Sequence, residues 1–533
     1  MYTDFFHEKK ILLVCREEFS RLLFFLAKNL IKSNALALYY VKPSETKFNK
    51  NISNESSFYF VKEKLGVPVY TTNDIADEFT STLKSDTIID VDYLTSIEEN
   101  YSHFLNLNAQ LVCTQELTRH YHYRYFWKYV NDVQQTNWLI LNYKNVEKVL
   151  DDFNPDVVVS CDNEELGYCV LREVCYYKKI PFVGIDYPRY DIYKIFSYDL
   201  GLHINEYLKE RYNNYILNSH VLKEELGYIM HFREKETIMH EMYKDDAVGT
   251  SQYKPDPLIK SVKNFIKLLL LLFKQDVIAK NASIKSSNPV LYPSSGGYIK
   301  YFAHMLVLKQ MLMRKNRYFH QPIDGEKYVY MPLHLIPEAT TFSLSPFYVN
   351  ELTIIEAVSK SLPAGWKLYV KEHQSMLGER SLEFYKKVNR LPNVKMVQLN
   401  YYTDPKPWIL KSQGVITISG TTAYEAALLG KQSVVFSDVS FSLIDGVNRI
   451  RSFEDLPEAL ARFKNSLHNE YSCAAFIKAV KDCGMPIDIK YLIKCSTEYI
   501  KKDSYNDSLF DDYINKLEEM LYKGYSLYGK YCK

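Results

Sequence analysis

From Val415 to Gly430 the sequence reads VITISGTTAYEAALLG. Val415–Ser419 is a β-branched apolar run that predicts a buried strand, and Thr422–Leu429 has the composition of a helix. Only Gly420 and Thr421 connect the two. A buried strand that passes directly into a helix is typical of a parallel α/β unit, so this stretch predicts the fold class.

The same alternation continues on both sides of this stretch. The predicted strands are Tyr328–Leu333, Trp366–Lys371, Val394–Leu399, Val415–Ser419 and Ser433–Ser437, and the predicted helices are Asn350–Lys360, Leu382–Arg390, Pro405–Ser412 and Thr422–Leu429. Connections of helix length between strands predict parallel pairing. We therefore expect a doubly wound parallel sheet, as in a Rossmann domain.

The N-terminal part of the chain predicts a second sheet of the same kind. Its predicted strands are Ile11–Cys15, Ala35–Val41, Val67–Thr71, Asp156–Ser160 and Pro181–Ile185, and its predicted helices are Phe19–Leu30, one or two helices within Gln115–Leu150, and Leu166–Lys178. The fold class is therefore α/β with two Rossmann-like domains.

The strand signals fade between these two units. Helices are predicted there over Asn205–Asn218, Lys223–Tyr243 and Leu258–Lys274, and the sequence after Ser452 is mainly helical. We expect four parts: an N-terminal Rossmann-like domain over 1–203, a helical connector or insertion over 204–325, a C-terminal Rossmann-like domain over 326–451, and C-terminal helices over 452–533 that pack back on the N-terminal domain.

The composition excludes several classes of protein. The 66 basic and 64 acidic residues leave a net charge of +2, which excludes a basic nucleic-acid-binding coat. The N-terminus lacks the basic start and apolar core of a signal peptide, and no apolar run approaches the ~20 residues of a membrane span. Nine cysteines without metal-ligand spacing indicate free thiols, so we expect a cytoplasmic protein. Nothing in the sequence explains the 46 tyrosines.

Ligands of a doubly wound sheet bind beyond the carboxyl ends of its strands, so the residues there are candidate site residues. The stretch Ser419-Gly420-Thr421-Thr422 follows one strand and begins a helix. Its hydroxyls, its glycine and the free backbone N–H groups suit a phosphate. The alternative is ordinary helix capping, with Thr422 and Glu425 as a capping box and Gly430 as the C-cap.

Two further strand ends have groups that suit an anionic ligand. Lys371 ends one predicted strand, and His373 follows it. The lysine would supply a positive charge to a phosphate, and the histidine would supply a hydrogen bond. His334 and Glu338 follow the first strand of the same domain and would reach a nucleotide or a sugar. Each pair has a structural alternative, a loop histidine with internal partners or a rigid turn between prolines.

Acidic residues follow the valine-rich strand of the N-terminal domain. Asp162 and Glu164 would face the second domain, where a carboxylate can accept the proton of an acceptor hydroxyl as general base. A solvated acidic strand end is the alternative. Asp90-Val91-Asp92 has a spacing that can hold a divalent cation, but it lies away from the expected phosphate site, so we expect no metal ion there.

Several short motifs of the C-terminal domain occur together in a known family. They are Met331-Pro332-Leu333-His334 with Pro337-Glu338, Leu362-Pro363 followed by Lys371-Glu372-His373, Leu391-Pro392-Asn393-Val394, and Ser419-Gly420-Thr421-Thr422 with Glu425-Ala426 and Gly430-Lys431. In their order and spacing, Lys327–Phe441, about a fifth of the chain, resembles the bacterial capsule polysaccharide biosynthesis family, which includes β-Kdo transferases.

The resemblance implies a glycosyltransferase of GT-B architecture, with two domains that face each other across a cleft. It implies that the C-terminal domain holds the nucleotide-sugar donor, that Ser419–Thr422 bind its phosphate and that Glu425 holds its ribose. His373 matches the histidine of the family's His-Pro motif, whereas Gln374 replaces the proline. This replacement leaves open whether the donor is CMP-linked, as CMP-Kdo or another CMP-linked acidic sugar would be, while His373 stays usable.

We therefore expect an enzyme without a cofactor that moves a sugar from a nucleotide-sugar donor to a glycan acceptor in surface or capsular polysaccharide biosynthesis. Asp162, Glu164 and His373 are its candidate catalytic residues. A sugar-nucleotide epimerase, a polyol-phosphate transferase and a non-catalytic scaffold stay open as alternatives, because fold alone does not separate them.

The partners follow from the same expectation. They are the donor and a glycan acceptor, with a lipid-linked acceptor left open, and no nucleic acid. The basic cluster Arg314-Lys315-Asn316-Arg317 predicts either a solvated helix end or a contact with the inner face of the cytoplasmic membrane.

Overall fold

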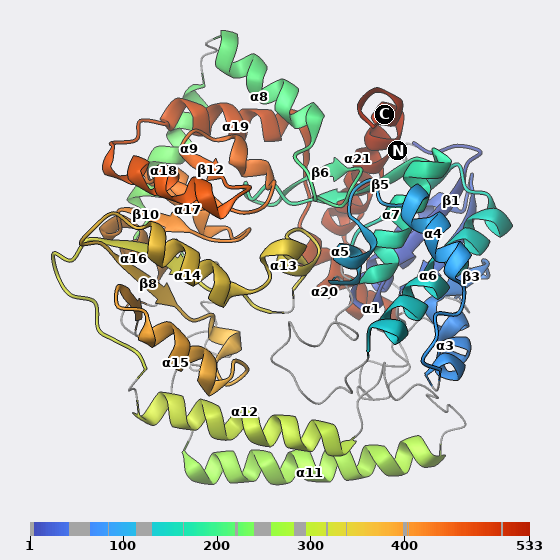
Figure 1. Cartoon of the computed structure of the whole chain (residues 1–533). Helices are drawn as coiled ribbons and strands as arrows, with labels where there is room; N and C mark the ends of the chain where they lie inside the picture. The colour runs from blue at the N-terminus through green and yellow to red at the C-terminus, as the bar shows by residue number, and fades with distance from the viewer. Residues whose placement is uncertain are drawn as a thin grey trace.

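Figure 1 shows the computed structural model of the chain, in which two α/β bodies lie side by side and a pair of long helices lies at one end. The structure describes residues 5–41, 64–83, 85–112, 131–163, 165–218, 222–238, 257–281, 295–315, 318–336, 338–397, 402, 404–502 and 505–532. Glu164, Pro337, Asn316 and Arg317 lie outside the described residues.

The N-terminal sheet has the strand order β13-β6-β5-β4-β1-β2-β3. Its strands are β1 (Lys10–Cys15), β2 (Ala35–Tyr40), β3 (Val69–Thr71), β4 (Val157–Ser160), β5 (Phe182–Asp186), β6 (Tyr193–Ser197) and β13 (Met485–Pro486). β1 pairs in parallel with both β2 and β4, so Ile11 lies beside Leu36 on one side and Val157 on the other. β6 and β13 are antiparallel, which the sequence did not predict.

Both faces of this sheet are buried, because successive side chains of a strand point to opposite sides. Ile11 and Leu13 join the core that includes α1, whereas Leu12 and Val14 join the core that includes α6 and α7. The helices and the 3₁₀ turn of this part are α1 (Glu17–Leu30), η1 (Thr72–Ile75), α3 (Ala76–Thr82), α4 (Val91–Asn100), α5 (Leu107–Val112), α6 (Asp132–Phe153) and α7 (Leu166–Lys178).

The C-terminal sheet is parallel throughout and has the order β9-β8-β7-β10-β11-β12. Its strands are β7 (Tyr328–Pro332), β8 (Lys367–Lys371), β9 (Val394–Met396), β10 (Gly414–Ile416), β11 (Ser433–Val435) and β12 (Val447–Arg449). Numbered in chain order within the domain, this is 3-2-1-4-5-6, the order of a dinucleotide-binding Rossmann sheet. The five predicted strands are present, and β12 extends the sheet.

Short helices surround this second sheet on both faces. They are α13 (Ala339–Phe342), α14 (Glu351–Ser361), α15 (Leu382–Arg390), α16 (Pro405–Lys411), α17 (Thr422–Leu428), α18 (Leu456–Ala461) and α19 (Glu470–Cys483), with the 3₁₀ turns η4 (Pro346–Tyr348), η5 (Gln374–Met376), η6 (Ser440–Leu443), η7 (Phe453–Asp455) and η8 (Arg462–Lys464). Tyrosines fill much of one core face: Tyr328 stacks on Tyr369 with ring centroids 4.1 Å apart. The Tyr328 hydroxyl donates to the Trp408 carbonyl at 2.9 Å. A tyrosine thus buries its apolar ring in the core, while its hydroxyl forms a hydrogen bond at the edge of that core.

The connector contains α8 (Glu206–Asn218), α9 (Lys223–Glu234), α11 (Leu258–Asn281) and α12 (Ser295–Lys315). α8 and α9 pack on α19 of the C-terminal half. α11 and α12 pack side by side at one end of the molecule, below α15 in the view of Figure 1. The predicted helix Lys223–Tyr243 ends at Glu234 among the described residues, and 239–256 lie outside them.

The end of the chain returns to the N-terminal sheet. β13 adds a strand next to β6, α20 (Ile489–Lys502) packs on α1, and α21 (Ser508–Tyr531) crosses β5 and β6. Gly524 makes this crossing possible, because a Cβ there would lie only 2.6 Å from Val183 Cγ1. The first and last parts of the chain therefore share one core.

The two sheets face each other with their carboxyl edges. Ser343, directly after α13, donates through its hydroxyl to the carbonyl of Asn163, which follows β4, at 2.9 Å. The Ser440 hydroxyl after β11 donates to the Asp186 carboxylate at the end of β5. The prediction of two facing Rossmann-like domains is confirmed in these contacts and in the strand orders (Figure 1).

No helix within the described residues is both long and apolar enough to cross a lipid bilayer. The eight cysteines that the structure describes form no disulfide.

Candidate functional site

The switch point of the C-terminal sheet lies between β7 and β10, where the chain order reverses. His334 follows β7 and Thr417 follows β10, and the two side chains meet there with His334 Nε2 2.9 Å from Thr417 Oγ1. The backbone N–H of Ile418 also donates to His334 Nε2, at 3.1 Å. The predicted site residue His334 is therefore a clamp between two strand ends.

The hydrogen bonds of His334 fix its protonation. Because Nε2 accepts the N–H of Ile418, the proton of the neutral ring belongs on Nδ1. Burial lowers the pKa of His334 to about 3, and the positive charge of nearby Arg380 acts in the same direction. The ring is therefore neutral at physiological pH.

A fully buried arginine connects the loops around this point. The Arg380 guanidinium lies 2.5 Å from a Glu351 carboxylate oxygen and 3.0 Å from both oxygens of Glu372, and all three side chains are 0% exposed. Arg380 also donates to the His334 carbonyl at 2.7 Å. Burial raises the pKa of Glu351 to about 7 despite the guanidinium. Two acidic groups on one arginine thus hold together the start of α14, the end of β8 and the loop after β7.

His373 follows β8 and presents a defined donor. Its Nδ1 accepts the backbone N–H of Ser375 at 3.2 Å, so the neutral ring has its proton on Nε2. Burial lowers the pKa of His373 to about 4, with Arg380 and Lys371 contributing. The ring therefore offers a neutral N–H from Nε2 that suits an anionic oxygen.

Lys371 ends β8 and is the most unusual charge of this edge. Lys371 is only 9% exposed, and burial lowers the pKa of its ammonium to about 8. Asp404 stabilises the positive charge from a distance, yet none of the described residues makes a hydrogen bond or an ion pair with the ammonium. A buried cation without such a partner favours an anionic ligand.

Two half-buried carboxyls lie at the same edge. Burial raises the pKa of Glu425 to about 7, and Asp404 acts in the same direction. Burial also raises the pKa of Glu338. The positive charge of Arg189, in the N-terminal domain, lowers the pKa of both carboxyls and so opposes both shifts. Arg189 is therefore near enough to this edge to act on it. At neutral pH, Glu425 is therefore present in part as a neutral hydrogen-bond donor.

The stretch Ser419-Gly420-Thr421-Thr422 has internal contacts at its first two residues and no side-chain capping bond at Thr421. The Ser419 hydroxyl donates to the Thr340 carbonyl, and a Cβ at Gly420 would lie 2.4 Å from Thr417 Oγ1. Internal packing alone thus explains this glycine. Thr421 occupies the N-cap position of α17 without a side-chain capping bond, so the predicted capping box is not formed. Gly430, with φ of 72°, ends the helix as the capping alternative predicted.

The N-terminal sheet has an equivalent pair at its own switch point. Arg16 follows β1 and Asp162 follows β4, and Arg16 Nε lies 3.0 Å from Asp162 Oδ2. The other oxygen of Asp162 accepts the N–H of Asn163 at 2.8 Å. Since Asn163 contacts Ser343, Asp162 lies at the edge that faces the second domain. The second candidate base, Glu164, lies outside the described residues.

Other predicted features are structural. Asp90 caps α4 through Tyr93 and pairs with Lys144 at 2.7 Å, which occupies both its oxygens. Within the part of the chain that the structure describes, no three His, Cys, Asp or Glu side chains form a metal-binding group. The central Arg380 was missed, because a lone arginine before α15 looks like a surface residue in the sequence.

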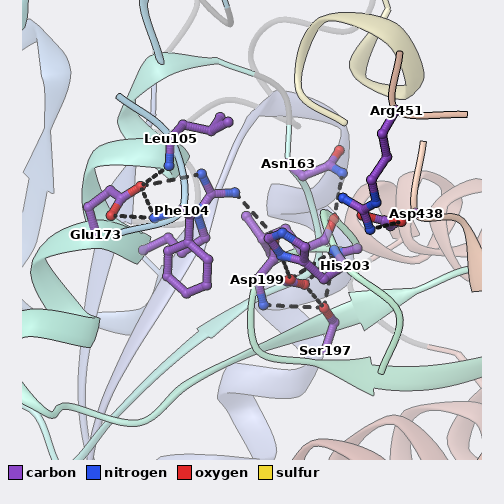
Figure 2. Close-up of polar contacts among 12 residues, drawn as sticks. Phe104, Leu105, Asn163, Glu173, Ser197, Asp199, His203, Asp438 and Arg451 are labelled. Carbon is purple, nitrogen blue, oxygen red and sulfur yellow. Dashed lines mark hydrogen bonds and ion pairs between the residues drawn. The ribbon is translucent and has the colours of Figure 1, made fainter. Parts of the chain in front are cut away.

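A second polar cluster lies beside the N-terminal sheet (Figure 2). It lies next to a cavity of about 190 Å³. His203 Nδ1 lies 2.9 Å from an Asp199 oxygen, and this hydrogen bond raises the pKa of His203. Asp438, from the C-terminal domain, adds to the shift. Sequence reasoning missed this cluster, because Asp199 and His203 follow an antiparallel strand that was not predicted.

Comparisons with known proteins give similarity in solved structures only. A UDP-GlcNAc 2-epimerase from Neisseria meningitidis matches with 14% identity and a TM-score of 0.22, over 89% of this chain and 99% of that one. The β-Kdo 2,4-transferase of Thermosulfurimonas dismutans KpsC matches with 10% identity and a TM-score of 0.30, over 64% of this chain and 88% of that one. Its β-Kdo 2,7-transferase matches with 8% identity and a TM-score of 0.27, over 63% and 80%.

No family model matches the chain, and no curated protein matches it. At identities and TM-scores this low, the matched structures carry no argument about the site, which rests on the geometry described above.

Replacement of Arg380 tests whether the buried charge network supports this edge. Arg380→Met leaves Glu351 and Glu372 buried without their cation, so we expect the free energy of unfolding to fall by about 3–5 kcal/mol in urea denaturation. Lys360→Met is the matched control, because Lys360 is 72% exposed in its pair with Glu356 and should change little. A loss below ~1 kcal/mol in Arg380→Met would contradict a supporting role.

Proposed function

We propose that this protein is a glycosyltransferase that moves a sugar from a nucleotide-sugar donor to the hydroxyl of a glycan acceptor. The observation that carries the proposal is the buried Lys371 ammonium, which lies at the carboxyl end of a Rossmann sheet without a hydrogen-bonding partner among the described residues. His373 and Glu425 accompany it at the same edge. A phosphate would satisfy the cation where such sheets bind ligands.

The donor's leaving group fits the groups on this edge. Lys371 supplies positive charge, and the Nε2 proton of His373 supplies a hydrogen bond to a phosphate oxygen. Glu425, protonated in part at neutral pH, can donate to the ribose or to the phosphate. The hydroxyls of Thr421 and Thr422 are proposed as further phosphate contacts, whereas the Ser419 hydroxyl donates to the Thr340 carbonyl and Gly420 packs against Thr417. His334 orients this loop, and Glu338 is proposed to face the sugar.

The transfer step needs a base on the opposite domain. In our proposal a carboxylate of the N-terminal edge, Asp162 or Glu164, takes the proton of the acceptor hydroxyl. The acceptor oxygen forms a bond to the anomeric carbon, the bond from that carbon to the phosphate oxygen breaks, and the nucleotide leaves with both electrons. Lys371 and His373 stabilise the charge that develops on that oxygen. Arg16 orients the Asp162 carboxylate for this role.

Titration calorimetry with CMP, UDP, GDP and CDP tests the donor site. We expect one nucleotide to bind in the micromolar range, and His373→Ala to weaken it about 10- to 100-fold, as loss of a hydrogen bond to a charged group does. Lys371→Met should weaken it at least as much, and Lys360→Met should leave it unchanged. If none of the four nucleotides binds, the enzymatic proposals fail and a scaffold is favoured.

The pH dependence of nucleotide affinity tests the protonation states. Glu425 and Lys371 have pKa values of about 7 and about 8, and an anionic ligand favours the protonated form of each. Affinity should therefore fall as pH rises from 6 to 9, about tenfold per pH unit for each linked proton. In Glu425→Gln the fall around pH 7 should disappear, while the ligand's own titration cancels in the comparison. An identical pH profile in both proteins would show that Glu425 does not sense the ligand.

Asp162→Asn separates transfer from donor binding. We expect it to abolish transfer to the glycan while nucleotide affinity stays within about twofold of the wild type, because Asp162 lies on the opposite domain. Loss of both would assign Asp162 to folding or to the donor. If the bound sugar nucleotide is epimerised or hydrolysed without any acceptor, the transferase proposal itself is wrong, and an epimerase is favoured instead.

A further inference from the structure

The helix pair α11–α12 has a charge unlike that of the rest of the chain. Leu258–Asn281 and Ser295–Lys315 contain nine Lys and Arg residues against one acidic residue, Asp276, which is a net charge of +8. The whole chain has a net charge of +2, so the remainder is negative at −6. The pair is therefore a localised cationic element on an otherwise acidic protein.

The first part of α11 also exposes an unusual amount of apolar surface. Leu258, Val262, Ile266 and Leu270 are 50–65% exposed, and Ile259 is 73% exposed. A spacing of four residues places side chains on one stripe of an α-helix. Val307 of α12 is 69% exposed as well. Six of the eighteen large hydrophobic side chains that are exposed among the described residues thus belong to this pair.

Lysines lie directly beside this stripe. Lys260, Lys263 and Lys267 are exposed, and on a helix of 3.6 residues per turn they project next to the apolar stripe, away from the side that carries Phe265 and Leu269. A stripe of apolar side chains bordered by lysines is the pattern of a helix that lies in the plane of a membrane surface. The lysines reach anionic headgroups while their aliphatic stems stay along the apolar stripe.

The pair is firmly attached through its other helix. Leu308 and Leu312 of α12 are buried in the core of the C-terminal domain. Gly378 allows this contact, since a Cβ there would lie 2.7 Å from the Met305 carbonyl. α11 packs on α12 and lies outside it, at the end of the molecule (Figure 1). The exposed stripe therefore belongs to a helix that is joined to the domain core through α12.

We propose that α11 docks this protein onto a membrane surface that contains anionic lipid, with Leu258, Ile259, Val262, Ile266 and Leu270 inserted among the headgroups. The positive charge of the helix pair favours a lipid layer that contains anionic headgroups. The rest of the chain has a net charge of −6 and is repelled from such a layer, so only this pair faces it. The inference goes beyond the proposed function and does not depend on it. It differs from the sequence-based expectation, which placed the contact at Arg314–Arg317 alone.

Flotation with lipid vesicles tests this proposal on the full chain. Vesicles of phosphatidylcholine alone are compared with vesicles that contain 30% phosphatidylglycerol, at about 0.1 M and about 0.5 M salt. We expect binding to the anionic vesicles only, weakened at the higher salt. The triple variant Lys260→Gln, Lys263→Gln, Lys267→Gln should bind about 100-fold more weakly, from about fivefold per lysine near the surface. Ile259→Ser with Ile266→Ser should weaken binding at least tenfold.

Matched controls separate docking from general effects. Lys360→Gln and Phe347→Ser change a 72% exposed side-chain cation and a 71% exposed aromatic elsewhere on the C-terminal domain, and should leave vesicle binding unchanged. All variants should keep the wild-type melting temperature and nucleotide affinity, so failure here is distinct from failure of the donor site. Absent binding, equal binding to neutral vesicles, or unchanged binding in the α11 variants would overturn the proposal. Concentration-dependent dimers that are lost in Ile259→Ser with Ile266→Ser would assign the stripe to a second copy and overturn it too.

Discussion

The buried pairing of Arg380 with Glu351 and Glu372 is the interaction on which the candidate site depends. It joins the loop after β7, the end of β8 and the start of α14, because one guanidinium contacts all three. Burial lowers the pKa of His334 and that of His373, and the positive charge of Arg380 adds to both shifts. The buried guanidinium therefore holds the sheet edge together and adds to the effect of burial that keeps these two rings neutral.

Each Rossmann sheet has its own polar clasp at the point where the strand order reverses. In the C-terminal sheet the clasp is neutral, between His334 and Thr417, whereas in the N-terminal sheet it is ionic, between Arg16 and Asp162. The two edges meet through Ser343 and Asn163. The Lys371 ammonium, which has no hydrogen-bonding or ion-pair partner among the described residues, and the Asp162 carboxylate thus lie at the carboxyl edges of different domains.

The sequence predicted what depends on local pattern, and it failed where distant residues meet. The alternation of Val415–Gly430 and its neighbours was enough to predict the parallel sheet and to place Lys371 and His373 at its edge. It was not enough for Gly420, which the pattern assigned to ligand approach and the structure explains by contact with Thr417. Nor did it predict Arg380, β6 or β13, because buried charge pairs and antiparallel strands added at one end of a parallel sheet are decided by tertiary packing.

The return of the chain end to the N-terminal sheet has a consequence for biosynthesis. β6 ends at Ser197, but its neighbour β13 begins only at Met485, about 290 residues later. At a synthesis rate of ~5–20 residues per second, the nascent N-terminal sheet waits about 15–60 s with an open edge and without the helix that covers it. An unpaired edge strand can pair with other strands, so the nascent sheet is open to edge-to-edge association during this interval. The N-terminal sheet is thus completed only when β13, α20 and α21 have been synthesised.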